Sequence, residues 1–189
     1  MSTGRRLHYS YEEYLACLEA SVLKLEYCDG TIYAMAGATP AHAELAAARL
    51  RVLGQALLGR CRVCSSDLKV RVEASDLSTF PDATVVCGDV CTSARDASAV
   101  TNPSVLVEVT SRSTEDYDRG DKLSHYKQLP SLRAVILGSH RSRRLSCVTR
   151  PPEGWAERDF RPGETVRLDE PELAIDVDAI YAGVTLEGM

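Results

Sequence analysis

Two short apolar stretches decide the fold, Pro81-Asp82-Ala83-Thr84-Val85-Val86 and Val105-Leu106-Val107-Glu108-Val109-Thr110. Runs of Val and Leu of this length are typical of strands that are buried on both faces of a sheet. Because an unpaired buried carboxylate is strongly disfavoured, we expect Glu108 to be protonated, paired or bound to a metal. If the two strands are neighbours, Asp82 and Glu108 converge on one divalent cation, as in a metal-dependent phosphodiesterase.

The length and composition indicate an ordinary globular protein. The 189 residues predict one domain, with 44% hydrophobic and 26% charged residues. No apolar run reaches the roughly 18 residues of a membrane helix, and the N-terminus is polar and charged where a signal peptide is apolar. We therefore expect a cytoplasmic protein without a membrane anchor.

The net charge of −5 weighs against strong non-specific binding to nucleic acid, since that binding needs basic contacts to phosphates. A local basic face remains compatible with this charge. The densest basic region contains Arg133, Arg141, Arg143, Arg144 and Arg150.

Local signals predict the first half of the chain in some detail. Residues 10–19 form a helix, because Ser10 and Glu13 make a capping box. Asp29-Gly30 lies between two β-prone runs and predicts a hairpin over 24–35. Leucines recur at helical spacing over 40–59, and residues 61–73 alternate as in a strand.

The second half continues with strands at 82–87 and 104–110, which enclose a loop at 88–103. A helix over about 114–129, capped by Ser113 or Thr114, and a strand at 133–138 follow. We expect 144–149 and 164–168 to form an antiparallel pair and 172–182 to form a last amphipathic element. This order predicts an α/β (α+β) fold, in which a central mixed sheet is flanked by helices and extended by the N-terminal β-hairpin.

Seven cysteines are present, an odd number in a chain that is not a small secreted scaffold, so we expect no disulfide framework. Cys61-Arg62-Val63-Cys64 has the C-x-x-C spacing, but a zinc or redox site would need a second pair or a helix N-terminus. We interpret the cysteines as small, buried or partly buried apolar residues.

A lysine beside the carboxylates would complete a hydrolytic site by stabilising charge in the transition state. Lys122 is the first candidate, because it lies in the helix after the Glu108 strand, and Asp118 and Tyr126 share its face. Lys69 is the rival candidate. His42 and Glu44, on the helix over 40–59, are candidates for an auxiliary ligand or a supporting contact.

Each candidate also has a purely structural interpretation. Asp82 is then a strand-start residue, Glu108 the partner of an arginine, and Lys122 half of an exposed helix pair. Lys69 beside Arg71 is then a solvated strand face, and His42 a capping histidine. No single candidate decides between these interpretations.

The chain resembles the putative restriction-endonuclease family, formerly a domain of unknown function, of the PD-(D/E)xK nuclease superfamily. The resemblance covers most of the chain, and its motifs, although each is short, together make it specific to this family. The resemblance rests on residues 11–15, 25–37 with His42, 65–71, Pro81-Asp82, 107–111 and 117–122.

The resemblance implies a single restriction-endonuclease-like domain over 1–189, in which Asp82 and Glu108 bind Mg²⁺ or Mn²⁺. The usual lysine of the superfamily would stand at position 110, where this chain has Thr110, so the role passes to Lys122. Glu26 and Glu44 are the two candidates for a further acid of the superfamily pattern.

The leading interpretation is an enzyme, a Mg²⁺-dependent DNA endonuclease with Asp82, Glu108 and Lys122 as catalytic residues and DNA as substrate. The alternative is a catalytically inactive nuclease-fold protein that acts in binding or assembly. A third interpretation is a protein that dimerises through the N-terminal hairpin or helix, and a nuclease of this kind is also expected to be a homodimer.

Overall fold

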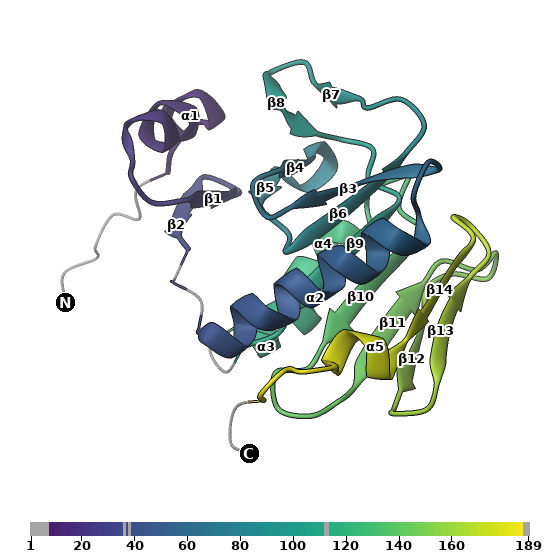
Figure 1. Ribbon diagram of the computed structural model, residues 1–189. Coiled ribbons are helices and arrows are strands. Elements are labelled where there is room, and N and C mark those ends of the chain that lie inside the picture. Colours follow the sequence, from purple (N-terminus) through teal and green to yellow (C-terminus); the bar gives the residue numbers. More distant parts are fainter. Residues whose placement is uncertain (1–7, 36, 38, 112–113, 187–189) are drawn as a thin grey trace.

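The computed structural model describes residues 8–35, 37, 39–111 and 114–186, and Figure 1 shows two layered sheets flanked by helices. Sheet 1 has the order β2-β1-β5-β4-β8-β7, and sheet 2 has the order β12-β11-β10-β9-β6-β3. The strands of sheet 1 are β1 (Leu25–Cys28), β2 (Thr31–Ala34), β4 (Lys69–Val72), β5 (Leu77–Thr79), β7 (Thr92–Ser93) and β8 (Asp96–Val100). Those of sheet 2 are β3 (Cys61–Ser65), β6 (Ala83–Cys87), β9 (Val105–Val109), β10 (Ala134–Gly138), β11 (Leu145–Thr149) and β12 (Ala156–Phe160).

The helices and a β-ribbon complete the described fold. The helical segments are α1 (Tyr11–Ala20), α2 (Pro40–Ala56), a 3-10 turn (Glu73–Ser75), α3 (Glu115–Tyr117), a π-helical turn (Asp118–Lys122), α4 (Leu123–Tyr126) and α5 (Val177–Tyr181). The ribbon pairs β13 (Thr165–Leu168) with β14 (Leu173–Asp176). Both sheets combine parallel and antiparallel pairs, which confirms the predicted mixed α+β fold.

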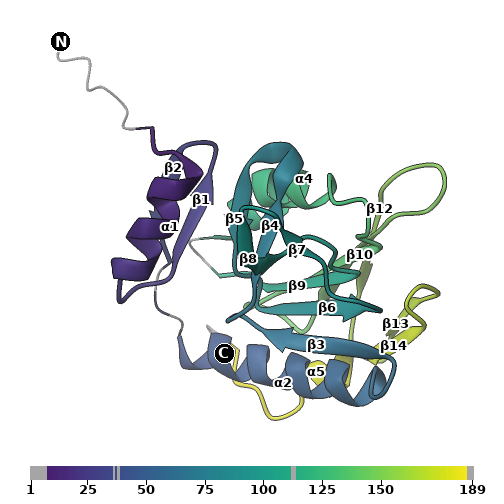
Figure 2. The same ribbon diagram turned by 90° about the horizontal axis from the view of Figure 1, so that it is seen from above.

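Three buried clusters set the layers of the molecule. Leu45 and Leu53 of α2 pack on the face of sheet 2 that carries Val85 and Val107. The opposite face of sheet 2 packs against sheet 1 and α4. The outer face of sheet 1 is covered by α1 through a cluster of three tyrosines, Tyr11, Tyr14 and Tyr27, whose rings contact one another. Figure 2 shows α1 beside the β1–β2 hairpin and α2 running along β3.

The local signals in the sequence account for the first elements. The Ser10 side chain accepts a hydrogen bond from the Glu13 N–H, and the Glu13 carboxylate accepts one from the Ser10 N–H, which confirms the capping box of α1. Asp29 and Gly30 both have positive φ, as a type I′ hairpin turn requires. Thr39 caps α2 and Pro40 takes its first position, so the predicted helix start is confirmed.

Two predictions for the middle of the chain are wrong. The strand expected over 61–73 is broken into β3 and β4 by a turn in which the Leu68 N–H donates to the Ser65 carbonyl. The loop expected over 88–103 contains β7 and β8, and β8 pairs in parallel with β4. Alternation over 61–73 shows that the segment is extended but not where it turns into another sheet. The loop was predicted from a composition rich in Asp, Ser, Thr and Ala, which does not reveal strands as short as β7 and β8.

The late pairing was also predicted wrongly. β11 pairs with β12 across the turn at 151–154, and β13 pairs with β14, so two local hairpins replace the expected 144–149 and 164–168 pair. The expected amphipathic element over 172–182 is divided between β14 and α5. Hairpins with short turns close smaller loops and therefore cost less conformational entropy.

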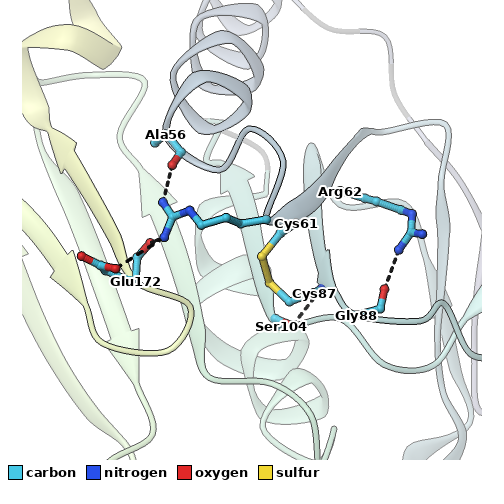
Figure 3. The surroundings of a disulfide bond; sticks show 8 residues. Ala56, Cys61, Arg62, Cys87, Gly88, Ser104 and Glu172 are labelled. Atoms are coloured by element: carbon cyan, nitrogen blue, oxygen red, sulfur yellow. Dashed lines mark hydrogen bonds and ion pairs between the residues drawn. A yellow bond between two sulfur atoms is a disulfide. The ribbon is translucent and has the colours of Figure 1, made fainter.

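Cys61 and Cys87 form a disulfide, contrary to the interpretation of the cysteines as unbridged apolar residues. They are directly opposite each other in the antiparallel β3–β6 pair, a register that sequence spacing does not reveal. Figure 3 shows the bridge next to Ser104, whose hydroxyl accepts a hydrogen bond from the Cys87 N–H. Disulfides of this kind are rare in reducing compartments.

Within the described residues, no helix combines the length and the apolar character that a membrane span needs. Ser113, one of the two predicted caps of the helix after β9, lies outside the described residues. The helix predicted over about 114–129 is present from Glu115 to Tyr126, with α3, the π-helical turn and α4 following one another without a break.

Candidate active site at the ends of two strands

The predicted carboxylate pair lies where β6 begins and β9 ends. Ala83 pairs with Val107 in the antiparallel register, so the next position along each strand places Asp82 opposite Glu108. The Asp82 Oδ2 accepts a hydrogen bond of 2.6 Å from the Val109 N–H, which fixes the carboxylate against the end of β9. Two acidic residues are therefore brought together, as the sequence predicted.

Glu108 is 4% exposed and is the centre of a buried ion cluster. Lys122 Nζ lies 2.9 Å from Glu108 Oε1, and the Tyr126 hydroxyl donates to the same oxygen at 2.6 Å. The lysine also lies 3.7 Å from Glu26 Oε1 and 3.8 Å from Asp118 Oδ1. Lys122 is thus held by three carboxylates, and it comes from the helix that was predicted to carry it.

The π-helical turn is what presents Lys122 and Asp118 to β9. Both side chains are buried, and the i,i+4 spacing brings them within ion-pair distance. A single wide turn inside an α-helix is frequent at functional sites, because it redirects side chains that a regular helix would send elsewhere.

Glu26 and His42 lie at the rim of this cluster. Glu26 Oε1 accepts hydrogen bonds from the Thr79 hydroxyl and from the Phe80 N–H at 3.2 Å, so β1 and β5 fix its position. His42 Nε2 lies 3.1 Å from Asp82 Oδ1, which ties the first turn of α2 to the carboxylate. Both auxiliary candidates therefore reach the site.

The other two candidates, Lys69 and Glu44, point away from the site. Alternation along β4 sends Val70 and Val72 into the layer between the sheets and Lys69 to the outer face, where it binds Asp96 at 2.6 Å. Glu44 accepts a hydrogen bond from the Thr185 N–H at 3.4 Å instead. The lysine beside the carboxylates is Lys122 rather than Lys69. The further acid beside them is Glu26 rather than Glu44.

The two opposed carboxyl groups have very different pKa values. Burial raises the pKa of Glu108 to about 8, an effect that Asp82 and Asp118 reinforce and Lys122 opposes. Burial also acts to raise the pKa of Asp82, but the hydrogen bond and charge of His42 and the Val109 N–H together hold it below its ordinary value. Two nearby carboxyls that share one site commonly separate in this way.

The remaining charges of the cluster also shift. Burial disfavours the charge on Lys122, yet Glu108 and the other acidic groups hold its pKa well above the ordinary value. Burial raises the pKa of Asp118, with Lys122 acting in the opposite direction. Lys122 therefore keeps its ammonium charge and Asp82 its carboxylate charge at neutral pH, while burial favours the protonated form of Glu108.

Sequence reasoning missed Arg49 and gave no role to Tyr126 and Asp118. Arg49 is 1% exposed and packs among Leu53, Val107 and Ile136 behind the strand ends. Its guanidinium makes no hydrogen bond of standard geometry within the described residues. Burial lowers the pKa of Arg49, and the neighbouring Tyr181 and Asp82 oppose this shift. Its i+4 spacing from Leu45 places it on the core face of α2 and could have revealed it.

The donor chemistry at this site fits a hard divalent cation. Within the described residues, no group of three or more His, Cys, Asp or Glu side chains is arranged to hold a metal ion alone. Mg²⁺ and Mn²⁺ commonly take one or two carboxylates and complete their shell with water and substrate phosphate. The Tyr126 hydroxyl and Lys122 Nζ both meet Glu108 at Oε1, so Oε2 is the oxygen that would serve as a cation ligand.

We predict that cation binding at this site releases a proton at neutral pH. Glu108, with a pKa of about 8, is mostly protonated at pH 7 and mostly ionised at pH 9, and a cation ligand must be ionised. Mn²⁺ titrations in buffers of different ionisation enthalpy should show close to one proton released at pH 7 and much less at pH 9. The same release at both pH values would contradict the raised pKa.

The raised pKa of Glu108 also makes the stability of the fold depend on pH. Without a cation, the folded chain keeps the Glu108 proton above the ordinary pKa of 4.5, at which the unfolded chain loses it. The contribution of Glu108 to stability is therefore complete below pH 4.5 and is lost as the pH rises through about 8.

Comparison with known proteins places the chain in a family. The Uma2 family, described as "Putative restriction endonuclease", matches residues 11–178. The uncharacterized protein slr1290 of Synechocystis sp. (strain ATCC 27184 / PCC 6803 / Kazusa) is 34% identical over 178 residues, which cover 93% of this chain and 92% of that protein. The uncharacterized protein sll1609 of the same strain is 30% identical over 126 residues, 66% of this chain and 71% of that protein.

The fold also has a counterpart among solved structures. The crystal structure of a putative nuclease belonging to DUF820 from Anabaena variabilis ATCC 29413 matches with a TM-score of 0.70 at 14% identity, over 87% of this chain and 93% of that chain. At this identity the match shows a shared fold. Because the family match extends over residues 11–178, the chain belongs to the Uma2 family of putative restriction endonucleases.

Proposed function

We propose that this protein is a divalent-cation-dependent endonuclease that hydrolyses phosphodiester bonds of DNA, with Asp82, Glu108 and Lys122 as its catalytic residues. One observation carries the proposal: Asp82 and Glu108 are opposed at the strand ends, with Lys122 Nζ 2.9 Å from Glu108. Membership of the Uma2 family supports the same reaction class.

Each residue has a separate task in this proposal. Asp82 and Glu108 are the ligands for Mg²⁺ or Mn²⁺, and a bound cation would activate water and stabilise charge on the phosphate. Lys122 places a fixed positive charge beside the carboxylates, where it stabilises the developing negative charge of the transition state. His42 and the Val109 N–H hold Asp82 in its ionised form, ready to act as a ligand.

The role of Lys122 predicts a loss of rate rather than a loss of cation binding. Lys122→Met keeps most of the apolar stem and should lower kcat by about 100-fold or more. Its Mn²⁺ affinity should change much less, because both carboxylates remain. Calorimetry and a plasmid-nicking assay on the same preparation would separate the two effects.

The matched control removes the other buried lysine. Lys69→Met combined with Asp96→Asn deletes both members of the ion pair on the outer face of sheet 1, so no buried charge is left unpaired. This double variant should nick plasmid at the wild-type rate. If it lost activity while Lys122→Met kept it, Lys69 would be the catalytic lysine.

The proposal as a whole is tested by nicking of supercoiled plasmid with Mg²⁺ or Mn²⁺, and with EDTA as control. We expect nicking that requires the cation and that elutes with the protein peak on a final sizing column. Light scattering on the same column tests the expected homodimer, since cleavage of both strands requires two sites.

A catalytically inactive nuclease-fold protein is the second candidate. One observation favours it: Thr110 occupies the position of the superfamily's usual lysine, and its hydroxyl donates to the Gly138 carbonyl at 3.3 Å within the fold. Cation binding and DNA binding without any nicking would identify this second function.

A further inference from the structure

The turn between β10 and β11, residues Ser139–Arg144, is a basic element that the proposed reaction does not yet use. Three of its six residues are arginines, in a chain whose net charge is −5. Gly138 pairs with Val109, so the turn begins at the same sheet edge at which β9 ends after Glu108. The basic turn and the carboxylates therefore lie on one side of the molecule.

Hydrogen bonds make this turn rigid. The Ser139 hydroxyl accepts from the N–H groups of Arg141 and Ser142 at 3.1 and 3.2 Å, and the Ser139 N–H donates to the Arg144 carbonyl at 3.0 Å. From α5, the Tyr181 hydroxyl reaches the carbonyls of Ser139 and Arg144. A turn held in this way presents its side chains at little further entropic cost.

A buried histidine couples the turn to the active-site strand. Arg141 Nε donates to His140 Nε2 at 3.0 Å, and His140 Nδ1 lies within hydrogen-bond distance of the Thr110 hydroxyl, at 3.2 Å. Thr110 stands two residues after Glu108. The position of Arg141 is thus fixed relative to the end of β9.

The charged ends of two of these arginines face solvent. The Arg141 side chain is 59% exposed, and its one acidic neighbour among the described residues is Glu115, at 3.9 Å. Arg143 is exposed and forms no ion pair within the described part of the chain. Arg144 differs, because it lies 3.4 Å from Asp159 and is partly buried. Two guanidinium groups are therefore available for an external anion.

We propose that Arg141 and Arg143 bind the DNA backbone next to the scissile phosphate and so supply the positive surface that the net charge of the chain lacks. Guanidinium groups match phosphate oxygens in geometry and charge. This proposal rests on the proposed function for its choice of DNA as the partner. Because backbone contacts carry no sequence information, the turn contributes affinity and register rather than base specificity.

The test measures DNA binding separately from cleavage. A fluorescent duplex is titrated in EDTA at several salt concentrations with wild type and with Arg141→Ala/Arg143→Ala, and nicking of plasmid is followed with Mn²⁺. Arg143→Glu is the second variant, because the Arg143 side chain is exposed and forms no ion pair within the described residues. Arg133→Ala/Arg158→Ala removes the same charge from other exposed arginines and is the control.

The turn variants should bind about 10-fold more weakly, and for the double variant the slope of log K against log salt should fall by about 2. KM for nicking should rise with kcat nearly unchanged, while the control and the Mn²⁺ affinity stay near wild type. If the turn variants bind DNA as tightly as the control does, the inference is overturned. Nicking by wild type would in that case still support the proposed function.

The remaining outcomes separate the two proposals. DNA binding that depends on the turn in a wild-type protein that does not nick supports the inference and contradicts the proposed reaction. A wild-type protein that neither binds nor nicks DNA overturns both.

Discussion

Asp82→Asn or Glu108→Gln should abolish cation-dependent nicking, with a loss of at least about 100-fold in rate for each variant. Both replacements keep the shape of the side chain but remove the charge that a hard cation needs as a ligand. Because the two carboxylates act as one unit, the double variant should be hardly slower than either single variant.

The fold should survive these two changes. Asp82→Asn can still accept from the Val109 N–H, and Glu108→Gln can still accept from the Tyr126 hydroxyl. Urea unfolding, followed by circular dichroism, checks this point. A variant that unfolds at much lower urea than wild type would assign the carboxylates to structure, and a fully active Glu108→Gln would remove Glu108 from the site.

Gly138→Ala should strongly destabilise the protein, by about 1–3 kcal/mol or more. A Cβ at this position would lie 1.6 Å from Arg49 Nη2, and the guanidinium is enclosed by apolar side chains. Gly138 is not among the glycines with positive φ, so the arginine rather than the backbone conformation requires glycine here.

Removal of the arginine should rescue the variant. In an Arg49→Met background the clash disappears, so Gly138→Ala should cost far less than in wild type, with a coupling of about 1 kcal/mol or more. Arg49→Met alone should be neutral or stabilising, because a buried charge without hydrogen-bond partners is replaced by an apolar side chain. Equal costs of Gly138→Ala in the two backgrounds, measured by urea unfolding, would contradict this packing.

The sequence predicted correctly those parts of the fold that depend on interactions between residues close together in the chain. The capping box at Ser10 and the turn at Asp29-Gly30 each specify a conformation within a few residues, and both are present. The break between β3 and β4, the β4–β8 pair and the Cys61–Cys87 bridge depend on register between distant segments. Periodicity does not contain that information.

The sequence predicted those residues of the candidate site whose charge stands in an apolar, buried segment. Glu108 was found because a carboxylate inside a Val and Leu run needs a partner, and Lys122 is that partner. The choice between Lys122 and Lys69 needed the position of α1, which covers the outer face to which Lys69 points. Arg49 was missed because arginines in an Ala- and Leu-rich helix are usually exposed.

The most direct test of the central claim is calorimetric titration of Mn²⁺ into wild type and into the Asp82→Ala/Glu108→Ala double variant, with plasmid nicking on the same samples. The account predicts binding and nicking by wild type and loss of both in a double variant that remains folded. Cation-dependent nicking that persists in the folded double variant would contradict the assignment of the active site.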